Sequence, residues 1–160
     1  MARDAASLLS LSLDGFMKPT TALLAGLLAL TADPAPSPAQ DFAVIVNAAN
    51  PVSTLSKDEV AKLFLKKTVA WQSGQSASPV ELPATAKVRE AFAREVLNKS
   101  VAQVRSYWQQ QIFSGRDVPP PEKPSEDEVL AFVRANPNAI GYVSRTANMG
   151  RGVKVVSLGP

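Results

Sequence analysis

The chain contains neither cysteine nor histidine. Without cysteine it has no disulfide, no thiol nucleophile and no cysteine-based zinc site. Without histidine it lacks the side chain that most readily acts as a general base near neutral pH. These two absences exclude several common classes of enzyme and metalloprotein. The lack of cysteine does not by itself identify the compartment in which the protein works.

A large excess of one charge is also missing. The 17 basic side chains exceed the 14 acidic ones by three, and the basic residues are scattered rather than arranged in a stripe. We therefore expect no nucleic-acid partner. Glu81, Glu90 and Glu95 form no acid–base pair, and the acidic residues do not recur at metal-ligand spacing. The sequence predicts no catalytic residue, no metal ligand and no cofactor, so we expect that the protein is not an enzyme.

The N-terminal region has an apolar run that is too short to span a bilayer. Ala22–Leu30 supplies nine apolar residues behind Lys18, whereas a spanning helix needs about 20. Such a run after a positive residue, followed by small residues, is typical of an export signal. The Pro-rich stretch Asp33–Ala39 indicates a linker. We interpret residues 1–39 as export signal and linker and residues 40–160 as one domain, so we predict a periplasmic protein with no transmembrane segment in its mature form. A buried N-terminal helix is the alternative.

The domain starts with a well-marked strand and helix. Ala43–Val46 reads as a buried strand, and Ser56 with Glu59 three residues later indicates a capping box at a helix start. We expect this helix to end at Lys66–Lys67. A short strand at Pro79–Leu82 follows, and then a helix that Thr85 caps and that runs to about residue 98.

The second half of the domain continues this alternation. A helix is expected from Ser100 to Gly115, a surface loop over Pro119–Pro124 and a helix that a second capping box opens at Ser125. Two strands should follow, over residues 139–143 and 153–158. We expect Gly141 to mark a close approach of the backbone to a neighbouring element. Strands that alternate with helices predict an α/β domain with a partly parallel sheet.

Three segments together resemble one family, the substrate-binding proteins of the phosphate ABC transporter type, which have the type II periplasmic-binding-protein fold. The segments are Leu55–Gly74, Pro79–Leu97 and Asn136–Ser144, in that order. In the family, the first ends in an I/L-F-x-G-K-x-x-x-W pattern, and the last reads N-P-G-A-I-G-Y-V. The matching positions here are Leu63–Lys67 with Trp71, Arg89–Phe92, and Pro137 with Ala139–Tyr142.

The resemblance implies a mixed central sheet flanked by helices, in a shortened or one-lobe version of the fold, because full members are about twice this length. It also implies a phosphate loop of sequence G-S-G-T at a helix start, where backbone N–H groups and the helix dipole hold the anion. The matching positions are Thr85, Ala86, Lys87 and Val88. None of them is a glycine, so the sequence departs from the family at the ligand.

The candidate ligand-binding residues lie in three groups. Thr85, Ala86, Lys87 and Arg89 surround the helix start, where the alternative role of Thr85 is a simple cap. The second group follows the first strand, where turn formation is the alternative. It consists of Asn50, Ser53 and Thr54. The third candidate is Ser144, after the Gly-Tyr strand, where the alternative is an exposed loop. We expect the first two groups to face the same edge of the sheet.

Two functions follow from these observations. The first is an exported solute-binding-type protein that binds phosphate or a similar small oxyanion for ABC transport, with a membrane transporter as its partner. The second is a periplasmic interaction or sensory module that keeps the fold without a ligand and binds a partner protein.

Overall fold

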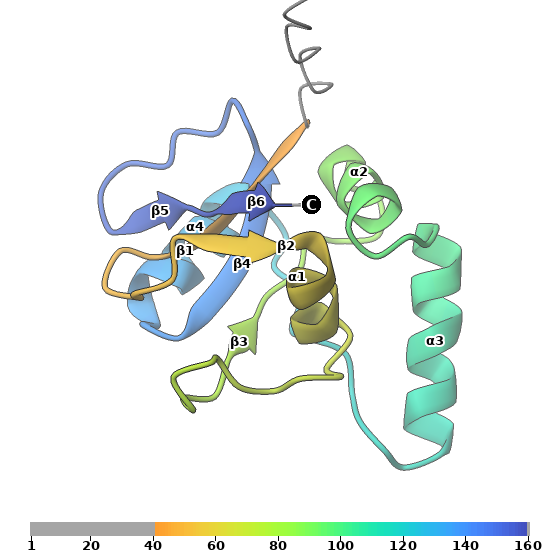
Figure 1. Ribbon diagram of the computed structural model, residues 1–160. Helices are drawn as coiled ribbons and strands as arrows, with labels where there is room; N and C mark the ends of the chain where they lie inside the picture. The colour runs from red at the N-terminus through yellow and green to blue at the C-terminus, as the bar shows by residue number, and fades with distance from the viewer. Residues whose placement is uncertain (1–40, 160) are drawn as a thin grey trace, which may run out of the picture. The chain divides into compact units, whose positions relative to one another are not determined.

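The computed structural model describes residues 41–159 (Figure 1). The export signal and linker predicted for residues 1–39 lie outside this range. In chain order the elements are β1 (Phe42–Asn47), β2 (Thr54–Ser56), α1 (Lys57–Phe64), β3 (Ser78–Pro79), α2 (Lys87–Glu95), α3 (Val101–Phe113), α4 (Glu126–Ala135), β4 (Ala139–Ser144), β5 (Val153–Val155) and β6 (Ser157–Gly159). None of these helices is long and apolar enough to cross a membrane.

The main sheet has four strands in the order β3-β4-β1-β5. Strand β1 runs antiparallel to β4 and to β5, whereas β3 runs parallel to β4. Strands β2 and β6 form a separate parallel pair. The predicted mixed α/β domain is therefore confirmed, with strand β1 buried along its whole length.

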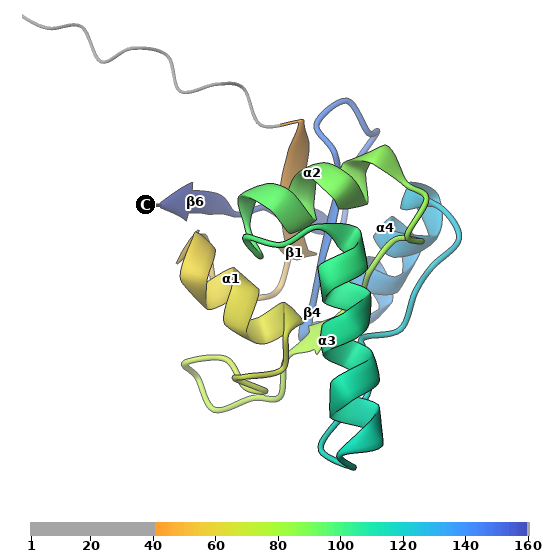
Figure 2. The ribbon, with the colours of Figure 1, turned by 90° about the vertical axis from the view of Figure 1, so that its right-hand side faces the viewer.

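Helices cover both faces of the main sheet. Helix α4 packs on β4 and β1 from one side, and α2 packs on the same two strands from the other, with α1 beside it (Figures 1 and 2). Helix α3 packs on α2 and stands at the edge of the domain (Figure 2). The domain thus has three layers, with α2 and α1 on one face of the sheet and α4 on the other.

Four aromatic rings fill the layer between the sheet and α1 and α2. The rings of Phe92 and Tyr142 stack with centroids 4.0 Å apart, and Phe64 meets Phe92 edge-on at 4.8 Å. Phe42 of β1 contacts Phe92 at 5.5 Å. Because such pairs add about 0.5–1.5 kcal/mol to the burial of their apolar area, this cluster fixes the position of α2 on the sheet.

Most helices start where the sequence predicts them to start. Ser56 and Glu59 form the predicted capping box, in which the Glu59 N–H donates to Ser56 Oγ at 3.2 Å and the Ser56 N–H donates to Glu59 Oε2 at 2.8 Å. Ser100 makes the same box with Gln103. At Ser125 only half of the predicted box forms among the described residues, with the Glu128 N–H donating to Ser125 Oγ.

Several predicted boundaries are wrong. Helix α1 ends at Phe64, before Lys66–Lys67, because Lys66 takes a left-handed φ of 51°. Thr85 does not cap α2: the Ala86 N–H donates to Pro83 O and closes a turn that leaves Ala86 at the N-cap position. The predicted final strand divides at Val156, whose N–H still donates to Val44 O of β1 before the chain turns to pair with β2.

The backbone at Gly141 closely approaches neighbouring side chains, as the sequence predicts. A Cβ at this position would stand 2.8 Å from Val129 Cγ1 of α4 and 3.0 Å from Val80 Cγ1. Replacing Gly141 by Ala should therefore lower the free energy of unfolding by about 1–3 kcal/mol through overpacking. Urea unfolding measures this change. The control is Gly159→Ala, where the nearest atom would be 3.9 Å away, and equal stability of the two variants would contradict the prediction.

Candidate functional site

The sheet topology separates the two segments that were expected to share one edge. Because β1 is antiparallel to β4 while β3 is parallel to β4, the carboxyl ends of β1 and β3 lie at opposite ends of the sheet. The segment Asn50–Thr54 follows β1, and Thr85 follows β3. The expectation of a shared edge is therefore wrong, and the cause is the mixed direction of the strands.

Asn50 forms the turn after β1. Its side chain is buried, its Oδ1 accepts a hydrogen bond from the Val52 N–H at 2.9 Å, and its Nδ2 donates to Pro137 O at 3.4 Å. Ser53 precedes β2 and Thr54 is its first residue; both are exposed and line a cavity of about 400 Å³. The other walls of this cavity come from α1 and from the loop around Trp71.

The start of α2 lies at a second hollow, of about 560 Å³, that Thr85 and Ala86 line together with the beginning of α3. The N-cap Ala86 has no side-chain hydrogen bond to offer, so no side chain caps the first N–H groups of α2. Such groups, together with the helix dipole, attract anions. Lys87 is exposed at this helix start.

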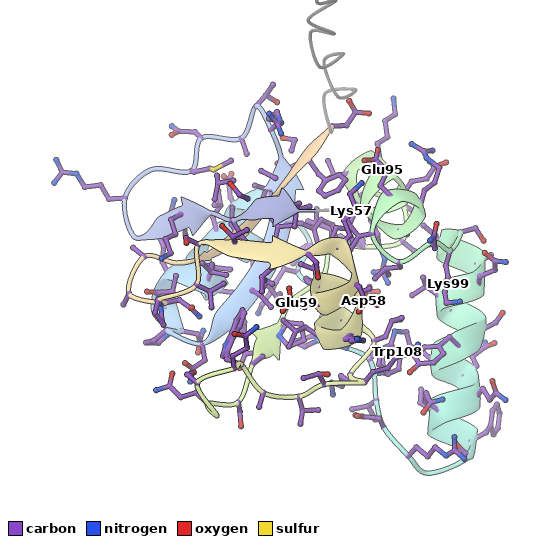
Figure 3. The ribbon with its side chains drawn as sticks, in the orientation of Figure 1. Lys57, Asp58, Glu59, Glu95, Lys99 and Trp108 are labelled. Carbon is purple, nitrogen blue, oxygen red and sulfur yellow. The ribbon has the colours of Figure 1, made fainter. Side chains whose placement is uncertain are left out.

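Further charged side chains surround the same hollow. Arg94 and Lys99 line it and add positive charge, whereas Glu90 adds a negative one. Lys99 stands at the junction between α2 and α3 (Figure 3). The hollow is therefore mixed in charge, and its two basic side chains belong to the last turn of α2 and to the junction that follows.

Arg89, the third residue of α2, points inward and is only 6% exposed. Its guanidinium donates through Nη1 to Leu82 O and, at 2.5 Å, to Glu122 Oε1. Its Nη2 lies 2.6 Å from Glu81 Oε2. Internal carboxylates thus already neutralise the one guanidinium that lies in the first turn of α2.

Burial strongly changes the pKa of Glu81. Burial raises the pKa of Glu81 to about 7, since Arg89 offsets only part of the desolvation and Glu122 adds a second negative charge. Tyr142 lies above it, where its Oη accepts a hydrogen bond from the Leu82 N–H at 3.4 Å. Burial and then the nearby Glu81 raise the pKa of Tyr142 as well. Both groups are therefore largely protonated in mildly acidic solution.

Ser144 is the last residue of β4. It is distant in sequence from Glu126, the first residue of α4, but contacts it in the structure. Its Oγ donates to Glu126 Oε2 at 2.8 Å, and its N–H donates to the same oxygen at 3.0 Å. Ser144 thus holds the first residue of α4. The structure brings Thr85, Ala86, Lys87 and Arg89 together and leaves Ser144 on a separate contact.

Sequence reasoning missed the two glutamates that bind Arg89. Glu81 carried a signal, because a lone carboxylate between Val80 and Leu82 in an apolar run implies a buried partner. Glu122 carried none, since it lies in a proline-rich loop 33 residues from Arg89. Within residues 41–159, no group of three or more acidic side chains is placed to hold a metal ion.

Comparison with known proteins supports the fold. No protein-family model matches the sequence, and no curated protein matches it. Among solved structures, an ABC-type phosphate transport receptor from Vibrio cholerae aligns with a TM-score of 0.57 and 19% identity, over 74% of this chain and 46% of that one. PstS from Borrelia burgdorferi gives 0.59 and 13%, over 74% and 47%.

A Clostridium perfringens chain solved with bound phosphate also aligns, with a TM-score of 0.59 and 20% identity over 74% of this chain and 44% of that one. The resemblance inferred from the sequence is therefore confirmed at the level of the fold. This chain spans less than half the length of each of these proteins. The neighbours are transport and binding proteins rather than enzymes.

The raised pKa of Glu81 predicts how stability depends on pH. The folded protein holds the Glu81 proton up to about pH 7, whereas the unfolded chain releases it near its ordinary value of 4.5. Folding therefore takes up a proton between these values, and this group makes the free energy of unfolding fall as pH rises from about 5 to about 7. The chain has no histidine to titrate in the same interval.

Urea unfolding at pH 5, 6, 7 and 8 measures this slope. Replacing Glu81 by Gln should abolish most of it, while replacing the exposed Glu128 by Gln should leave it unchanged. A slope that the Glu81→Gln variant retains in full would contradict the assignment.

Proposed function

We propose that the protein is an exported solute-binding-type protein that binds phosphate or a similar small oxyanion at the start of α2 and delivers it to an ABC transporter. The observation that carries this proposal is the uncapped N-terminus of α2, in a fold shared with phosphate-transport binding proteins. The predicted export signal supports a periplasmic location, and a membrane transporter is then the partner.

The first turn of α2 provides the chemistry that an oxyanion requires. Its free N–H groups supply donors, the helix dipole favours a negative charge, and Lys87 adds a mobile cation at the surface. The Thr85 hydroxyl is exposed beside these groups. Ala86 and Lys87 stand where the family has Ser and Gly, so the anion approaches the backbone less closely than over a glycine.

The other candidate ligand-binding residues lie outside the proposed site. Asn50, Ser53 and Thr54 lie beyond the opposite end of the sheet, and Ser144 is bonded to Glu126. The proposed site therefore consists of Thr85, Ala86 and Lys87, and the side chain of Arg89 in the same turn of α2 points inward to Glu81 and Glu122. Because Glu90 and Glu122 bring negative charge close to it, we expect binding in the micromolar to millimolar range rather than tighter.

Isothermal titration with phosphate tests the proposal. The wild-type protein should release heat on binding, and Lys87→Gln should weaken the affinity about threefold to tenfold, because one charge-assisted contact is lost. Lys67→Gln is the control, since Lys67 is exposed after α1 and lies on a different element from the start of α2.

Absence of heat up to millimolar phosphate and sulfate would overturn the proposal. The fold would then serve without a small ligand, as an interaction or sensory module. An equal loss of affinity in the two lysine variants would show that the overall charge, rather than the start of α2, attracts the anion.

A further inference from the structure

Strand β2 has one unpaired edge. Among residues 41–159 it pairs with β6 alone, which lies along its other edge (Figure 1). The Ser157 N–H donates to Ser53 O at 2.9 Å. Because successive residues of a strand direct their N–H and C=O groups toward alternate edges, Ser53 and Leu55 face β6 and Thr54 faces away from it. The N–H and C=O groups of Thr54 therefore point out of the unpaired edge.

The neighbouring N–H groups on the same edge have local partners. The Val52 N–H donates to Asn50 Oδ1 at 2.9 Å, and the Ser56 N–H donates to Glu59 Oε2 at 2.8 Å. Within the part of the chain that the structure describes, no side chain accepts a hydrogen bond from the Thr54 N–H in this way. Thr54 therefore offers a second chain both a donor and an acceptor.

The cavity of about 400 Å³ runs along this edge. Every residue of Pro51–Leu55 lines it. Side chains alternate between the two faces of a strand, so a cavity over one face would be lined by every second residue, and an unbroken run indicates the backbone edge. The facing wall comes from the loop around Trp71 and from one side of α1, at Glu59, Lys62 and Leu63. We call this cavity the β2 recess.

Part of the β2 recess is apolar. Leu55, Leu63 and Trp71 are buried in the hydrophobic core and also line the cavity. The Trp71 indole is held in place, because its Nε1–H donates to Asn138 O at 3.1 Å. The side chain of Thr54 is exposed, whereas that of Leu55 points to the core. In a chain paired with Thr54, the side chains before and after the paired residue would therefore lie on the apolar side of the recess.

We propose that the edge of β2 at Thr54 binds an extended peptide segment of a partner protein by strand addition, with an apolar side chain of that segment in the β2 recess against Leu63 and Trp71. A donor and an acceptor on an open strand edge match an extended backbone, and the adjoining apolar wall selects alternate side chains. The recess suits an anion less well, since Lys62 already lies 2.6 Å from Asp58 and Glu59 adds a carboxylate.

The β2 recess is separate from the start of α2. The two hollows share no lining residue, and they belong to segments at opposite ends of the main sheet. The inference is therefore independent of the proposed binding of phosphate. Failure of the phosphate titration would leave it standing, and its own failure would leave the proposed oxyanion site standing.

Hydrogen exchange in the free protein tests the open edge. The Thr54 N–H should exchange at the rate of an exposed amide, whereas the Leu55 N–H, which faces β6, should be protected. Protection of the Thr54 N–H that rises with protein concentration would overturn the proposal, because a second copy of this chain would then occupy the edge.

Titration with a defined peptide tests the occupant. The probe is the blocked peptide Ac-Lys-Thr-Leu-Thr-Leu-Thr-Glu-NH2, which alternates polar and apolar side chains around a central threonine. In ¹⁵N–¹H spectra, the Thr54 amide and the Trp71 indole should shift together at micromolar to millimolar peptide, and the Thr54 N–H should become protected. A peptide with serine in place of both leucines should bind at least about tenfold more weakly, because it has no apolar side chain for the recess.

Two variants of one residue separate the backbone from the side chain. Thr54→Pro removes the N–H that points away from β6 and leaves the β2–β6 hydrogen bonds in place, so peptide affinity should fall about threefold to tenfold. Thr54→Ala is the matched control: it keeps the N–H and should bind the peptide as the wild type does. Thermal unfolding followed by circular dichroism checks that both variants fold. If Thr54→Pro does not fold, protection of the wild-type Thr54 N–H by the peptide decides the assignment.

Three results would overturn the inference. The first is the absence of any shift up to millimolar peptide. The second is a set of shifts confined to β5, the strand at the open end of the main sheet. The third is an equal loss of affinity in Thr54→Pro and Thr54→Ala, which would assign the contact to the side chain rather than to strand addition.

Discussion

The pairing of β1 between β4 and β5 is the constraint on which the rest of the domain depends. All six residues of β1 are buried, and each of its two edges makes an antiparallel ladder. With β1 fixed, helices cover both faces of the sheet, and the carboxyl ends of β1 and β3 point in opposite directions. The direction of one strand therefore places the segment after β1 and the start of α2 at opposite ends of the sheet.

A cluster of charged side chains centres on Arg89 in the first turn of α2. Placing Arg89 in the interior costs desolvation energy, and the structure offsets this cost with Glu81, Glu122 and Leu82 O. The same contacts set the electrostatic character of the helix start. An uncapped helix N-terminus favours an anion, whereas the carboxylates of Glu81 and Glu122 face the guanidinium of Arg89.

The shared fold and the local site thus carry different information. Alignment with phosphate-transport proteins at TM-scores of 0.57 and 0.59 describes the arrangement of the backbone, over less than half of each of those chains. The ion pairs at Arg89 belong to the side chains of this sequence. At under 25% identity, these alignments establish the fold alone.

Local patterns in the sequence determined most of the elements. The capping boxes at Ser56 and Ser100, the buried strand β1 and the close contact at Gly141 follow from neighbouring residues alone, because caps and alternation act over a few positions. Tertiary structure alone decided the direction of β3 relative to β1, the turn that displaced Thr85 from the N-cap, and the contact of Glu122 with Arg89. Those features depend on which distant segments pack together, and a periodicity of two or four residues contains no information about that.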